Sequence, residues 1–312
     1  MGDRRTRWIG GGLAGLVAAL VAVAVLATPS AHPTAGRPAS PAVTASAAPA
    51  TPVPTADAAA IFPRAGAEDV ADRPWFLVVG DSISFGLTVD PRRFGTNSSW
   101  VTQIQPMLGA GGPVADDLAC PGETTASYAS ACPLVQLARW LSGTSQRSAA
   151  LDAVRAHATT LRFIVVELGA NDLLNARRDG VPLTTTLAQL YTRLSGIVGD
   201  LAAAAPGVRV ILANLYDPYA PSDLAASQAV DQADAAIAAV AAERNAAVAD
   251  WHAAINGGAV PLGTLVDLAH GDVHPTVEGH RALATEMLAV LERQGLAPLP
   301  GGAPLAVGQG GG

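Results

Sequence analysis

Short apolar runs alternate with longer amphipathic segments along most of the chain. Four runs have the length and composition of buried strands, and these are Trp75–Val79, Phe163–Leu168, Val208–Ala213 and the weaker Ala246–Ala249. Runs that are apolar on both faces are typical of parallel strands. Between the second and third runs, apolar side chains repeat at helical spacing and predict one buried helix face. This face consists of Leu187, Leu190, Tyr191, Leu194, Ile197, Val198 and Leu201.

Two later segments, Ala225–Ala242 and Val277–Leu291, follow the same helical pattern. Strands that alternate with helices over residues 73–297 predict one doubly wound, three-layer α/β domain with a parallel sheet. Ligands of such domains bind at the carboxyl ends of the strands. We therefore looked for candidate chemistry at that edge of the sheet.

The N-terminus has the pattern of a segment that enters a membrane. Three arginines among the first seven residues precede an uncharged apolar stretch, Trp8–Ala27. We interpret residues 1–27 as a signal peptide or an N-terminal transmembrane anchor. A length of about 20 apolar residues favours a retained anchor, whereas the small residues that end the stretch suit cleavage and secretion. In either case we expect an extracellular or cell-surface protein.

Two segments have too little apolar content to fold around a core. Residues 28–60 are rich in Ala, Pro and Thr and predict a disordered linker, and the Gly-rich residues 298–312 predict a disordered tail. All 19 basic residues are arginine, and the net charge of -7 leaves no basic stripe for nucleic acid. We expect a monomer that contacts the membrane only through its N-terminal segment.

The chain contains two cysteines, Cys120 and Cys132. Outside the cytoplasm, a close pair of this kind predicts a disulfide, which would stabilise the fold by about 3 kcal/mol. The alternative is two free buried thiols. Neither cysteine belongs to a Cys/His cluster, so zinc is not indicated.

Two motifs follow predicted strands directly. Ser82 stands in Gly-Asp-Ser-Ile-Ser (80–84), where it is either a nucleophile or a cap of the next helix. Ser84 is a rival hydroxyl, but its position favours a turn or capping role. Asn171, in Gly-Ala-Asn-Asp (169–172), either caps a helix or donates its amide to an oxyanion.

Two further motifs lie in loops. Gly122 follows Cys-Pro and either offers an unobstructed backbone N–H or forms an ordinary turn. His274 precedes a helix that we expect to start at Thr276, and it is either a general base or a surface histidine. His270 and His280 flank it, but they have no carboxylate or cysteine at metal-ligand spacing.

Together, in this order and at these strand ends, the four motifs resemble those of the SGNH (GDSL-type) hydrolases from about Arg73 to Leu296. The resemblance implies a flavodoxin-like SGNH hydrolase fold and an esterase or lipase that acts on esters or thioesters of lipids, short acyl groups or acylated sugars. It implies Ser82 as nucleophile and His274 as base. The oxyanion hole would comprise the N–H groups of Ser82 and Gly122 and the Asn171 side chain. No cofactor or metal is needed.

One position departs from the family pattern. The family usually has an aspartate three residues before the histidine, and this chain has Gly271 there. We expect Asp272, one residue closer, to orient His274. The alternatives are a backbone carbonyl or Asp267 from further upstream.

The acyl group and the acceptor are open at this point. Alternative functions are a cell-envelope O-acyltransferase, a sugar O-acetyl esterase and a non-catalytic surface binding module, for which the missing acid is the only argument. The loops Leu87–Ser99 and Tyr216–Asp223 are expected to form the pocket walls. Tyr216 and Tyr219 either line an acyl or sugar site or pack, and we interpret them as packing residues.

Overall fold

The computed structural model describes residues 73–87, 98–134 and 143–297. The predicted N-terminal membrane segment, linker and tail therefore lie outside the described residues. In the described ranges, no helix combines the length and the apolar character that crossing a membrane requires.

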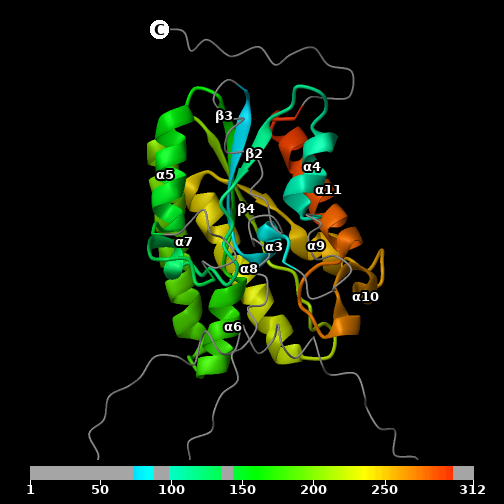
Figure 1. Ribbon diagram of the computed structural model, residues 1–312. Helices are drawn as coiled ribbons and strands as arrows, with labels where there is room; N and C mark the ends of the chain where they lie inside the picture. The colour runs from blue at the N-terminus through cyan, green and yellow to red at the C-terminus, as the bar shows by residue number, and fades with distance from the viewer. Residues whose placement is uncertain (1–72, 88–97, 135–142, 298–312) are drawn as a thin grey trace, which may run out of the picture. The chain divides into compact units, whose positions relative to one another are not determined.

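A five-stranded parallel sheet forms the centre of the domain (Figure 1). Its strands are β1 (Trp75–Gly80), β2 (Val114–Asp117), β3 (Leu161–Glu167), β4 (Arg209–Ala213) and β5 (Ala247–Ala249). Their order in the sheet, β2-β1-β3-β4-β5, is that of flavodoxin-like doubly wound folds. The predicted parallel sheet is confirmed, and the four predicted strands are present with ends shifted by one or two residues.

The edge strand β2 is absent from the prediction. Asp116 and Asp117 occupy half of this short strand, so its sequence is not an apolar run. Both aspartates are nevertheless buried, and Asp117 pairs in register with Val78 of β1. The Asp117 carboxylate accepts the N–H of Ala119 at 3.0 Å, and this hydrogen bond offsets part of the free energy that burial of the carboxylate costs.

Helices cover both faces of the sheet, and the sheet separates two cores. The helices are α3 (Ser82–Phe85), α4 (Trp100–Met107), α5 (Gln146–His157), α6 (Ala170–Asp179), α7 (Leu183–Ala204), α8 (Leu224–Arg244), α9 (Trp251–Asn256), α10 (Leu262–Leu265) and α11 (Val277–Arg293), with 3-10 turns η2 (Ser127–Ala129) and η4 (Leu268–His270). One core contains side chains of α5, α7 and α8, and the other contains side chains of α4, α9 and α11. Figure 1 shows α5 and α7 on one side of the sheet and α4 and α11 on the other.

Strand side chains alternate between these cores, as the pleat requires. In β1, Leu77 and Val79 face the α7 side, whereas Phe76 and Val78 face the α11 side. Phe76 stacks on Phe163 of β3 with ring centroids 4.7 Å apart. Because the middle residues of β1, β3 and β4 are buried on both faces, they form apolar runs, which is why the sequence revealed these strands.

The three predicted helices are present as parts of α7, α8 and α11. The predicted apolar face of α7 is buried at Leu190, Leu194 and their neighbours. The assignment of Tyr191 to that face is wrong, since this residue is 36% exposed. Its hydroxyl donates to the carboxylate of Glu243 on α8, because a tyrosine hydroxyl needs a polar partner that the core does not provide.

Candidate active site

The turn that carries Ser82 lies directly beyond β1. Asp81 caps α3, because its carboxylate accepts the N–H of Ile83 at 2.9 Å, so Ser82 is not the helix cap. A Cβ at Gly80 would lie 2.6 Å from Ser84 Oγ, which explains why this position is glycine. The turn leaves Ser82, itself 9% exposed, on the wall of a pocket.

His274 lies against Ser82, although the two residues are 192 positions apart in the chain. Its Nε2 is 2.9 Å from Ser82 Oγ, and its Nδ1 is 2.6 Å from Asp272 Oδ1. The predicted helix start is confirmed at Thr276, whose hydroxyl accepts the N–H of Gly279 at 3.1 Å and caps α11. Three side chains from two loops thus form one hydrogen-bonded series, the arrangement that activates a serine hydroxyl.

The loop before His274 explains the departure at Gly271. This glycine has φ +68°, a left-handed conformation that an aspartate adopts only with strain. The next residue, Asp272, carries the carboxylate that meets His274. Asp267, the more distant candidate, instead contacts Nδ1 of His270 at 2.6 Å.

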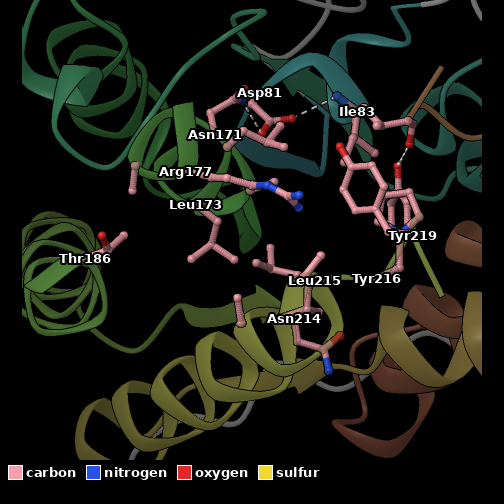
Figure 2. Close-up of a pocket in the computed structure, with 18 of the residues that line it drawn as sticks. Asp81, Ile83, Asn171, Leu173, Arg177, Thr186, Asn214, Leu215, Tyr216 and Tyr219 are labelled. Carbon is pink, nitrogen blue, oxygen red and sulfur yellow. Dashed lines mark hydrogen bonds between the residues drawn. The ribbon is translucent and has the colours of Figure 1, made fainter. Parts of the chain in front are cut away.

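Asn171 lies in the first turn of α6 and lines the same pocket as Ser82 and His274. It is not the helix cap, which is Gly169. Its amide nitrogen donates to Asp81 Oδ2 at 2.8 Å (Figure 2). A side-chain amide has two N–H groups, and this bond uses one of them while it fixes the direction of the other.

A disulfide and a backbone hydrogen bond fix the loop that contains Gly122. The predicted disulfide between Cys120 and Cys132 is present, with a Cα–Cα distance of 5.9 Å. The N–H of Cys120 donates to the carbonyl of Gly80 at 3.0 Å, which joins the loop to the Ser82 turn. Gly122 has φ +79°. It is not among the residues that line the pocket, so its place in an oxyanion hole stays a prediction.

Asp172, to which the sequence assigned no role, ties α6 to this loop. Its carboxylate accepts the Thr125 N–H at 2.8 Å and the Thr125 hydroxyl at 2.6 Å. Burial raises the pKa of Asp172 above its usual value. The contact joins the segments of Gly122 and Asn171 through two buried residues.

A second buried carboxylate, Glu167 at the end of β3, accepts hydrogen bonds from the residues on either side of Ser82. Its Oε2 accepts the N–H of Asp81 at 3.0 Å and the hydroxyl of Ser84 at 2.9 Å. Trp100 donates its indole N–H to the same Ser84 hydroxyl at 3.0 Å. Of the two roles expected of Ser84, a turn or a cap, the cap is wrong, because Asp81 caps α3 and the Ser84 hydroxyl links two buried groups. Glu167 was missed, although an acid inside an apolar strand was a signal.

Burial disfavours the charged form of these acids. It raises the pKa of Asp81 to about 6, with the hydrogen bonds from Ile83 and Asn171 acting in the opposite direction. Burial and the neighbouring charge of Asp81 raise the pKa of Glu167 well above its usual range. Burial and mutual repulsion thus make it unfavourable for both carboxyl groups of this pair to be charged at once.

The pocket beside Ser82 has a volume of about 410 Å³. Tyr216 and Tyr219, interpreted above as packing residues, both line it. Tyr216 also packs, since it is buried and its hydroxyl donates to the carbonyl of Val273 at 2.6 Å. Of the other predicted wall, Leu87–Ser99, residues 88–97 lie outside the described residues.

The two histidines that flank His274 do not join it. His270 pairs with Asp267, and His280 is fully buried in α11. In the part of the chain that the structure describes, no cluster of three or more His, Cys, Asp or Glu residues could hold a metal ion.

The sequence matches the model of the GDSL-like lipase/acylhydrolase family over residues 78–282. The chain belongs to this family. The match confirms the resemblance drawn from the four motifs, and family membership supports a hydrolase that acts on small-molecule esters. A comparison with curated proteins gave no match.

Solved structures of esterases share the SGNH hydrolase fold of this GDSL-family chain. Axe2, an acetylxylan esterase from Geobacillus stearothermophilus, is 20% identical with a TM-score of 0.51, and the match covers 71% of this chain and 95% of that one. A variant of it, described as an acetyl-xylooligosaccharide esterase, is 20% identical with a TM-score of 0.50 over 70% and 94% of the two chains. TesA is 23% identical with a TM-score of 0.47 over 70% and 98%.

Proposed function

We propose that this protein is an exported serine esterase that hydrolyses carboxylic esters through an acyl-enzyme. The observation that carries the proposal is the series of contacts from Asp272 through His274 to Ser82, at 2.6 Å and 2.9 Å. In this mechanism His274 Nε2 accepts the Ser82 proton while Ser82 Oγ attacks the ester carbonyl. Asp272 holds the imidazole in the tautomer that leaves Nε2 free to accept, and it stabilises the imidazolium.

The remaining steps use the same groups. The proton on His274 passes to the leaving alkoxide, and the alcohol departs from the acyl-serine. Water then gives its proton to His274 and attacks the acyl carbon. The bond between the acyl carbon and Ser82 Oγ breaks as His274 returns the proton to Oγ, which releases the carboxylic acid and restores Ser82. The oxyanion of each tetrahedral intermediate would be held by the N–H groups of Ser82 and Gly122 and by the Asn171 amide.

Export belongs to the same proposal. It is supported by the disulfide between Cys120 and Cys132, because such bonds persist mainly in oxidising compartments. It is also supported by the arginine-flanked apolar stretch at the N-terminus. Reporter fusions at residue 60 that are active only on the cytoplasmic side would contradict it.

The catalytic assignment is tested in the full-length protein with p-nitrophenyl esters. Ser82→Ala and His274→Ala should each lower kcat by on the order of 10⁶-fold, and Asp272→Ala by on the order of 10⁴-fold. The matched control is His270→Ala, since His270 makes a 2.6 Å contact with Asp267 in the same loop. Retained activity in Ser82→Ala, or an equal loss in His270→Ala, would refute the assignment.

A further inference from the structure

The pocket beside Ser82 extends away from the sheet between two helical walls. Leu173 on α6 and Leu183 on α7 line one side, and Ala229 and Val230 on α8 line the other. Figure 2 shows Leu173 and Leu215 directed toward one another across the space. Ser82 lines the same space, so a group attached to the reacting carbonyl can lie along these apolar walls.

Two polar side chains that line the pocket, those of Asn214 and Tyr216, are already bonded within the protein. The two amide atoms of Asn214 engage the carboxylate of Asp250 at 2.9 Å and the N–H of His252 at 3.0 Å. Tyr216 donates its hydroxyl to the carbonyl of Val273 at 2.6 Å. A sugar in this pocket would find these groups occupied, whereas a hydrocarbon chain needs none of them.

One charged side chain of the pocket, that of Arg177, lies at its solvent edge. Arg177 on α6 pairs with Asp223, the cap of α8, at 2.7 Å, and its guanidinium lies 5.9 Å from the centre of the Tyr219 ring. The Arg177 side chain is 61% exposed, so its charge remains in water. This bridge joins α6 to the cap of α8, the helices that carry the two walls.

We propose that this pocket binds an aliphatic acyl chain, so that medium-chain acyl esters, rather than acetyl esters of sugars, are the substrates. The inference rests on the proposed function of Ser82. The cavity volume of about 410 Å³ lies within the roughly 300–1,000 Å³ of small-molecule sites, which leaves room for an acyl chain of medium length. An acetyl group would leave most of the apolar wall in contact with water.

The first test is a chain-length series of p-nitrophenyl esters from acetate to palmitate with the full-length protein. Each methylene that enters the pocket should raise kcat/KM by up to about fourfold, until the chain reaches a medium length. Ala229→Phe, which fills the space between the walls, should lower the octanoate-to-acetate ratio of kcat/KM by at least about tenfold, the equivalent of about two excluded methylenes. Ala238→Phe is the matched control, because Ala238 is an exposed residue of the same helix.

A second measurement separates this inference from the catalytic one. Octanoate should bind to the Ser82→Ala variant in calorimetry. The added change Ala229→Phe should weaken that binding by at least about tenfold, as for the ratio of kcat/KM. Binding without turnover in wild type would overturn the catalytic proposal and support the acyl pocket. Activity that requires Ser82 but is highest on acetate, or a preference for octanoate that both phenylalanine variants retain, would overturn the acyl pocket.

Discussion

The substitution Asp81→Asn tests the role of the carboxylate that orients the Asn171 amide. In wild type, Asp81 Oδ1 accepts the N–H of Ile83, and its Oδ2 accepts the amide of Asn171 at 2.8 Å. An asparagine at position 81 has the same shape and retains the oxygen that caps α3. The substitution replaces Oδ2 with an NH2 group, so that two donors, this group and the Asn171 amide, face one another. The Asn171 amide then loses its acceptor and must rotate.

The expected magnitude follows from the number of donors. The proposed oxyanion hole has three, and one of them depends on Asp81. Removal of a single oxyanion donor costs about 10²- to 10³-fold in kcat. We expect Asp81→Asn to lower kcat by a factor in this range and to change KM little, because the Asn171 donor acts on charge that develops in the transition state.

The assay is a double-mutant cycle with Asn171→Ala. The kcat for one ester is measured for wild type, the two single variants and the double variant. If Asp81 acts through Asn171, Asp81→Asn should have almost no further effect in the Asn171→Ala background. An equal loss in both backgrounds would refute this reasoning. It would instead indicate that the charge of Asp81 acts on His274, which is also close enough to influence the pKa of Asp81. Asn171→Ala alone provides the reference loss.

Two further predictions concern stability. Burial raises the pKa of Glu123 from 4.5 to about 7, so the unfolding free energy should fall as pH rises through this window, by on the order of 3 kcal/mol for this group. Glu123→Gln should therefore melt at a higher temperature than wild type at pH 8 and depend less on pH, and an unchanged slope would contradict the burial argument. Replacing Cys120 and Cys132 by serine should lower the unfolding free energy by about 3 kcal/mol in urea, and equal stability in oxidised and reduced wild type would refute this.

Much of the fold could be predicted because central strands of a parallel sheet are apolar on both faces. This signal was clear for Trp75–Gly80 and Leu161–Glu167. It was missing for the edge strand β2, where Asp116 and Asp117 are buried with polar contacts that its sequence does not reveal. The surface position of Tyr191 likewise depends on Glu243, which lies on another helix.

The site was predictable to the extent that its residues follow strand ends. Ser82 and Asn171 both meet this condition, and His274 was found from its family motif. The supporting groups were not predictable, because their roles arise from contacts between segments distant in sequence. Glu167 meets Asp81 across 86 positions, and Asp172 meets Thr125 across 47 positions. No local pattern specifies such pairs.

The short spacing between Asp272 and His274 has a consequence for protein engineering. Asp272 Oδ1 makes two contacts with His274. It accepts the backbone N–H at 3.3 Å, and it lies 2.6 Å from the ring nitrogen Nδ1. The acid and the base are thus held together by a closed ring within three consecutive residues. A transplant of residues 272–274 would carry this acid–base contact with it, and the placement of the histidine ring relative to Ser82 would then have to be restored.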